Sequence, residues 1–139
     1  MAVVLLDSAA VVAFLDSANV FHRAADRAIS DGARDDRLIS SAINYAEVLR
    51  SAGLGHHAQE VVRGFFSELV AEIVPADREV AERAAQLRAT KPSLRLPDAL
   101  VLASADLHAD AVLGADRQWL QVTGLRCELR LLEAHRPGR

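Results

Sequence analysis

Short apolar segments of strand length alternate along the whole chain with longer segments of helical periodicity. The expected strands are residues 3–6, 37–40, 71–74, 111–114 and 127–132. The expected helices lie between them, at residues 9–15, 19–29, 41–53, 56–69, 77–89, 97–108 and 116–121. This alternation predicts an α/β fold with a central, mostly parallel sheet and helices on both of its faces.

Individual residues indicate where several helices begin and end. Asn19 and Asp77 are expected as N-caps, Pro97 as a first helical residue, and Gly32 as the stop of the helix that begins at Asn19. The 139 residues contain no repeat or linker, so we expect one domain over residues 1–135 and a loose tail at 136–139.

Bulk properties exclude several classes of protein. Cys127 is the single cysteine, so an internal disulfide or a cysteine-rich zinc site is excluded, as suits the cytoplasm. The apolar N-terminus lacks a basic region and is interrupted by Asp7, so we expect neither a signal peptide nor membrane association. A formal net charge of −3 argues against a general nucleic-acid coat, although four acids held by a metal would leave the remaining bases in slight excess.

Two acids follow expected strands. Asp7 comes directly after residues 3–6, and Asp116 follows residues 111–114 by two positions. Ligands of open α/β sheets bind beyond the carboxyl ends of the strands, so both acids are candidates for one cleft. Each also has a purely structural explanation as a turn or N-cap residue.

Two more acids lie on helices. Asp98 lies in the first turn of an expected apolar helix. There it either interacts favourably with the helix dipole or points into a partly enclosed site. Glu47 shares a helix side with Ile43 and is expected to border a buried stripe, unless it simply pairs with Arg50. The expected stripe consists of Ala42, Ala46, Leu49 and Gly53.

The four acids together favour a metal site. Carboxylates gathered at one edge of a core repel each other and are hard to desolvate, and a divalent cation removes that conflict. Oxygen-only ligands indicate Mg²⁺ or Mn²⁺ rather than zinc. The expected metal ligands and catalytic residues are Asp7, Glu47, Asp98 and Asp116.

Four segments around these acids make the sequence similar to a known family. VVLLDSAAVVAFLD, SSAINYAEVLRSAG, LRLPDALVLASA and AVLGADRQWL resemble, in order and spacing, the PIN domain of VapC-type toxins over about residues 3–132. Two positions depart from the family pattern. A Thr or Ser is frequent where this chain has Gly114, and a further acid is frequent where it has Gln118.

The resemblance implies a function, a site and partners. It implies an endoribonuclease toxin that is dimeric and is inhibited by a small VapB-type antitoxin. It assigns the acidic site to the four acids named above, and Ser8 to the small-hydroxyl position after the first Asp.

The expected reaction is hydrolysis of phosphodiester bonds in single-stranded RNA by a metal-activated water. Asp98 or Asp116 is the candidate base for that water. Arg50, Arg95 and Arg117 lie near the acids in sequence and, with Ser8, are candidate contacts to the substrate.

Two other functions stay open from the sequence. One is a metal-dependent phosphatase of another α/β family, although aspartyl-phosphate enzymes usually carry DxD after the first strand, and this chain has Asp7-Ser8-Ala9. The other is a non-catalytic module that keeps the PIN fold, against which the four acids argue. The adjacent His56 and His57 face different sides of a helix and are not expected to chelate one ion. Histidine catalysis is not expected either, because the sequence offers no histidine acid–base pair.

Overall fold

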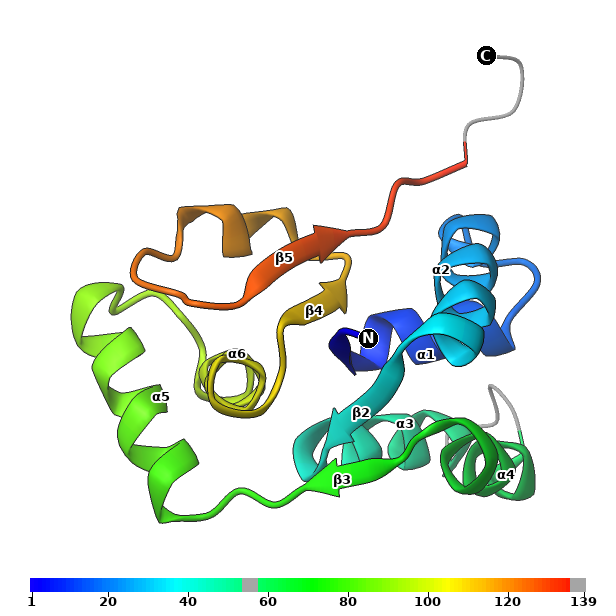
Figure 1. The fold of residues 1–139 in the computed structure, drawn as a ribbon, viewed down its shortest axis with the longest axis horizontal. Coiled ribbons are helices and arrows are strands. Elements are labelled where there is room, and N and C mark those ends of the chain that lie inside the picture. The colour runs from blue at the N-terminus through cyan, green and yellow to red at the C-terminus, as the bar shows by residue number, and fades with distance from the viewer. Residues whose placement is uncertain (54–57, 136–139) are drawn as a thin grey trace.

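A five-stranded parallel sheet forms the centre of the computed structural model, which describes residues 1–53 and 58–135 (Figure 1). The strand order is β3-β2-β1-β4-β5, and every neighbouring pair is parallel. The strands are β1 (Val3–Leu6), β2 (Arg37–Ser41), β3 (Glu72–Val74), β4 (Ala111–Gly114) and β5 (Glu128–Leu131). The α/β class is confirmed, and the described sheet is wholly parallel.

Helices cover both faces of the sheet, and each face has its own apolar core. One core packs β1 side chains Val4 and Leu6 against the first four helices, and the other packs Leu5 against the last helices. The alternation of neighbouring residues between the two cores follows from the two-residue repeat of a strand. The first four helices are α1 (Ser8–Leu15), α2 (His22–Asp35), α3 (Ala42–Gly53) and α4 (Gln59–Leu69). The last three are α5 (Arg78–Thr90), α6 (Leu96–His108) and the 3₁₀ helix η1 (Arg117–Gln121).

The expected bounds of α2 are wrong at both ends. The side-chain oxygen of Asn19 accepts a hydrogen bond from the Phe21 amide at 2.9 Å, so Asn19 closes a turn and the helix begins at His22. Gly32 does not stop the helix but lies buried inside it, facing Leu38. A β-carbon at Gly32 would be 3.0 Å from Leu38 Cδ2, so this glycine serves close packing of α2 on β2.

Other helix boundaries agree with the sequence. Asp77 caps α5 by accepting from the Val80 amide at 3.0 Å, and Pro97 lies in the first turn of α6. The expected start of the fourth helix at His56 and the expected tail at 136–139 lie outside the described residues. No helix in the described part of the chain is long and apolar enough to span a membrane.

The strand order places a switch in chain direction between β1 and β4. The chain progresses from β1 through β2 to β3 on one side, and then returns to place β4 and β5 on the other side of β1. Loops diverge at such a point and leave a crevice at the carboxyl ends of the two strands. Asp7 directly follows β1, and its amide donates to the Leu113 carbonyl of β4 at 2.9 Å, so the first candidate acid lies at the switch point.

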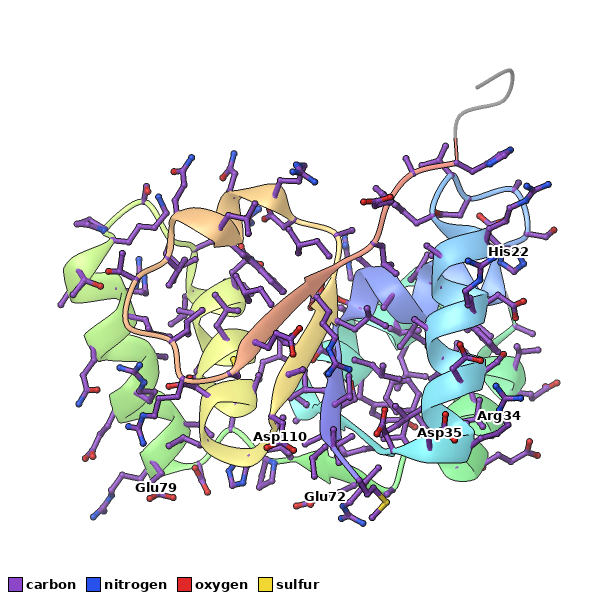
Figure 2. All side chains as sticks on the ribbon, turned by 45° about the horizontal axis from the view of Figure 1, so that its top comes forward. His22, Arg34, Asp35, Glu72, Glu79 and Asp110 are labelled. Carbon is purple, nitrogen blue, oxygen red and sulfur yellow. The ribbon has the colours of Figure 1, made fainter. Side chains whose placement is uncertain are left out.

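Acids also lie at the opposite, amino-terminal edge of the sheet, where Figure 2 labels Asp35, Glu72 and Asp110. Asp110 accepts a hydrogen bond from the Val3 amide at 2.7 Å, and Glu72 pairs with Arg37 at 3.3 Å. Asp36 similarly accepts from the Ala2 amide at 3.1 Å. Asp110, Glu72 and Asp36 thus have structural partners, which provides a comparison for the acids at the other edge.

Candidate metal-binding site at the carboxyl edge of the sheet

Asp7 is the most buried of the four candidate acids, with 9% of its surface exposed. It occupies the N-cap position of α1, yet its side chain makes no capping hydrogen bond. Burial and the nearby charge of Glu47 raise the pKa of Asp7 to about 7, and hydrogen bonds from Ser8 and Asn44 only partly oppose that rise. A carboxylate is therefore held where its charge is unfavourable, which a structural N-cap would not require.

Asn44 on α3 orients Asp7, and sequence reasoning did not single it out. It is fully buried, and its Nδ2 donates to Asp7 Oδ1 at 2.9 Å. Its own Oδ1 accepts from the Ser41 hydroxyl at 2.6 Å, which fixes the amide in one orientation. The available signal was an asparagine in the first turn of α3, three residues after the serine that ends β2.

Glu47 lies one helical turn beyond Asn44 and faces the same edge. Its Oε1 accepts a hydrogen bond from the Ser8 hydroxyl at 3.0 Å, and its charge raises the pKa values of both Asp7 and Asp98. The alternative considered from the sequence, a pair with Arg50, is not formed within the described residues, where the ion pairs involve other arginines.

The expected buried stripe of α3 is wrong. The buried residues are Asn44, Val48 and Ala52, whereas Ala46 is exposed and Glu47 stands on the solvent side. The hydrogen bonds of Asn44 to Ser41 and Asp7 explain the difference, because they turn a polar residue inward.

Asp98 lies in the first turn of α6 and is half-buried. Burial, the charge of Asp116 and the charge of Glu47 raise the pKa of Asp98, while the Arg95 guanidinium opposes the rise. Asp98 therefore lies within electrostatic reach of two other candidate acids. The helix dipole at this position favours a negative charge, but it does not offset the crowding.

Asp116 has a structural role as well as a place in the site. It is the N-cap of η1, and its Oδ1 accepts from the Gln118 amide at 2.9 Å. The side chain is exposed and lines the same cavity as Asp98. The capping explanation considered from the sequence is thus confirmed for Asp116, in addition to its place beside the other acids.

The substrate-contact candidates have different surroundings. Ser8 contacts Glu47 and also accepts from Asn44 Nδ2 at 3.5 Å, so it belongs to the acidic cluster. Arg95 lines the cavity that contains Asp98 and Asp116. Arg117 lines a second cavity with Phe21, and Arg50 is exposed on α3.

A tryptophan explains why residue 114 is glycine. A β-carbon at Gly114 would lie 2.8 Å from Cζ3 of Trp119, which is 1% exposed, and 3.5 Å from Cβ of Asp7. The Thr or Ser suggested by the family pattern is therefore excluded here by the indole ring of η1. In this chain, the part of the site around Gly114 is therefore shaped by the packing of Trp119 and not by a hydroxyl group.

We predict that Gly114→Ser lowers the free energy of unfolding by about 1–3 kcal/mol, because the rigid buried ring leaves no room for the side chain. Gly64→Ala is the matched control. A β-carbon there meets nothing within 4 Å, and alanine favours the helix. Urea unfolding of the two variants checks this. Equal stability of Gly114→Ser and the parent would show that Trp119 is not locked in place.

The donor set suits a hard divalent cation. Its candidate ligands are all carboxylates, and the charges of Asp7, Glu47, Asp98 and Asp116 disfavour each other as they stand. Within residues 1–53 and 58–135, no three acid, histidine or cysteine side chains already converge into a metal-binding group. Asn44 holds Asp7 in place, whereas the side chains of Glu47 and Asp116 are exposed. Binding of a cation would therefore require the exposed side chains to rotate toward Asp7.

Comparisons with known proteins agree with the fold. A family model described as the PIN domain matches residues 4–125. A toxin–antitoxin complex from Klebsiella pneumoniae is 26% identical, with a TM-score of 0.70 over 86% of this chain and 92% of that chain. No curated protein sequence matches the chain.

Two further solved structures share the fold at lower identity. VapBC2 from Rickettsia felis, bound to a DNA fragment from its promoter, is 13% identical, with a TM-score of 0.75 over 94% of this chain and 99% of that chain. Mycobacterium tuberculosis VapC20, described as a Sarcin-Ricin loop cleaving toxin, is 14% identical, with a TM-score of 0.63 over 78% and 86% of the two chains.

Proposed function

The chain belongs to the PIN-domain family, and we propose that it is a VapC-type toxin that cleaves single-stranded RNA with Mg²⁺ or Mn²⁺ bound by Asp7, Glu47, Asp98 and Asp116. The observation that carries the proposal is the contrast between the two edges of the sheet. At the amino edge, Asp36 and Asp110 accept backbone hydrogen bonds and Glu72 pairs with an arginine. At the carboxyl edge, in contrast, the charge of Glu47 raises the pKa values of Asp7 and Asp98, and the charge of Asp116 also raises that of Asp98. Such crowding at a switch point is typical of a functional site.

Each residue of the cluster has a role in the proposed reaction. A cation bound by the four acids would offset the charge of the phosphate and make a nearby water more acidic. Asn44 holds the Asp7 carboxylate in place, and Ser8 does the same for Glu47. Asp98 and Asp116, which line one cavity, are the two candidates for accepting the proton of the attacking water.

Mapping the ends of cleaved RNA tests this function. Water attacks phosphorus, the bond from phosphorus to the 3′ oxygen breaks, and that oxygen leaves with a proton. We therefore predict a 5′-phosphate and a 3′-hydroxyl. Cleavage also continues when the 2′-hydroxyl at the cut is replaced by hydrogen, because that group is not the nucleophile. Ligation-based mapping of a cut single-stranded RNA reads the ends directly.

Other outcomes identify the competing functions. Cyclic phosphate ends, or activity in excess EDTA, would contradict the proposal and direct attention to the cavity lined by His22 and His135. Hydrolysis of phosphate monoesters without RNA cleavage would indicate the phosphatase. Metal-independent binding without hydrolysis of either substrate would indicate the non-catalytic module.

The proposed partners follow from the family and from two of the neighbouring structures. The Rickettsia felis and Klebsiella pneumoniae structures are complexes of toxin with antitoxin. We infer that this chain forms a homodimer in the cytoplasm and is inhibited by a VapB-type antitoxin. Light scattering of the purified chain checks the dimer, and a strictly monomeric mass at high micromolar concentration would contradict it.

A further inference from the structure

We propose that the cavity between the α5–α6 loop and η1 binds a phosphate of the RNA backbone next to the cleaved bond, through Lys91, Ser93, Arg95 and Gln118. This inference rests on the proposed function and adds to it a binding site for one flanking phosphate. The cavity has a volume of about 240 Å³ and shares Asp98 and Asp116 with the candidate metal site. It is smaller than the roughly 300–1,000 Å³ of typical small-molecule pockets, so it suits one charged group and not a whole nucleotide.

The loop that forms one wall is fixed by its own hydrogen bonds. The Lys91 amide donates to Leu87, and the Leu94 amide donates to Lys91, both at 3.0 Å. Arg88 Nε then donates to the Leu94 carbonyl at 2.9 Å, and the Leu94 side chain is buried. With Leu94 anchored, Lys91, Ser93 and Arg95 all line the cavity. The backbone that carries these donors is thus ordered before a ligand arrives, which lowers the entropic cost of binding.

The two cations of this cavity are available to a ligand. Within the described residues, neither Lys91 nor Arg95 forms an ion pair, whereas Arg83 is bound to the buried Asp106 at 2.9 Å. Lys91 Nζ only donates to the Gln121 side chain at 3.2 Å. Arg95 lies close enough to lower the pKa of Asp98. An ammonium and a guanidinium beside a hydroxyl group are suitable donors for a phosphate.

Residue 118 makes the cavity suitable for an anion rather than a second cation. The family pattern suggests an acid there, but this chain has Gln118, which is exposed and lines the cavity. Trp119 also lines the cavity, and its buried Nε1 has no hydrogen-bond partner within the described residues. Asp98 and Asp116 are the only acids among the described residues that line the cavity, and both are candidate metal ligands, so Gln118 adds no third negative charge.

A chemical double-mutant cycle tests the subsite. The substrates are single-stranded RNA oligonucleotides with one cut site and one neutral methylphosphonate, placed in turn at each linkage beside the cut. For the parent, we expect kcat/KM to fall about tenfold or more at one flanking position. The double variant Lys91→Ala/Arg95→Ala should cleave the unmodified RNA with that lower kcat/KM. The same methylphosphonate should not lower its kcat/KM further.

Two variants complete the design. Arg34→Ala is the control, because Arg34 forms an exposed pair with Asp31 at the end of α2 and lies at the amino edge in Figure 2. It should retain the full methylphosphonate effect. Gln118→Glu should lower kcat/KM by placing a negative charge in the cavity. Additive losses from Lys91→Ala/Arg95→Ala and the methylphosphonate would overturn the proposal, even if the parent cleaves RNA.

A binding measurement separates this proposal from the cleavage reaction. Trp119 is the only tryptophan and lines the cavity, so its fluorescence reports on occupancy. Uridine 3′,5′-bisphosphate, titrated in Mg²⁺, should change that fluorescence in the parent and in Arg34→Ala, but about tenfold more weakly in Lys91→Ala/Arg95→Ala. If the parent cleaves no RNA but shows this pattern, the proposed function fails while the phosphate site stands. Equal titrations in all variants would refute the phosphate site.

Discussion

Replacing Asp98 with asparagine is expected to reduce RNA cleavage by more than about 100-fold, because loss of an outer partner of a metal ligand already costs about 10–100-fold. Asp98 is half-buried beside Asp116 and Glu47, and an amide cannot supply the missing negative charge. The same loss is expected for Asp7→Asn and Asp116→Asn. Initial rates at saturating Mg²⁺ or Mn²⁺ measure it.

Stability separates a catalytic role from a structural one. Without metal, Asp7→Asn and Asp98→Asn should be at least as stable as the parent, because each removes one of several repelling charges. Asp110→Asn is the matched control at the other edge of the sheet, where the carboxylate accepts from the Val3 amide. It should retain cleavage. Strong destabilisation of both Asp7→Asn and Asp98→Asn, with Asp110→Asn equally inactive, would mean that these acids support the fold only.

In the metal-free protein, the contribution of Asp7 to stability is expected to be lost as the pH rises from about 4 to about 7. The pKa of Asp7 is raised from 3.8 to about 7 in the folded protein, so folding favours the protonated acid. Its stabilising contribution is complete below the unfolded value and is lost as the pH passes through the folded one. From these two values the loss is roughly 4 kcal/mol. The raised pKa of Asp98 acts in the same direction.

Comparison with Asp7→Asn isolates this contribution from other titrating groups. Urea unfolding in EDTA at several pH values should show the variant gaining stability over the parent as the pH rises, with no further gain much above pH 7. Mg²⁺ should reduce the difference, because a bound cation favours the ionised acid. A stability difference that is constant between pH 4.5 and 7.5 would contradict the burial of a strained carboxylate at Asp7.

The sequence predicted the central strands β1 and β4 well because both are short apolar runs that are buried on both faces. Val3–Leu6 and Ala111–Gly114 were expected with the bounds that the structure has. The order of the strands then explains the acids, since Asp7 and Asp116 follow β1 and β4, which are neighbours in the sheet. Position after a strand was therefore enough to predict half of the candidate site.

The features that were missed depend on contacts between distant segments. Asn44 has the appearance of an ordinary polar residue on a helix until β2 lies beside β1 and brings it to Asp7. Gly32 has the appearance of a helix stop until Leu38 packs against it. Gly114 departs from the family pattern for a reason that becomes visible only when Trp119 fills the space beside it.

Metal binding is the central claim, and thermal unfolding of EDTA-treated protein titrated with Mn²⁺ tests it most directly. A ligand at 100 times its Kd stabilises the folded state by about 2.7 kcal/mol, which corresponds to a rise of several degrees in Tm. We predict that rise for the parent and for Asp110→Asn, its reversal by EDTA, and its loss in Asp7→Asn and Asp98→Asn. A parent Tm that stays unchanged through a millimolar Mn²⁺ titration would contradict the account.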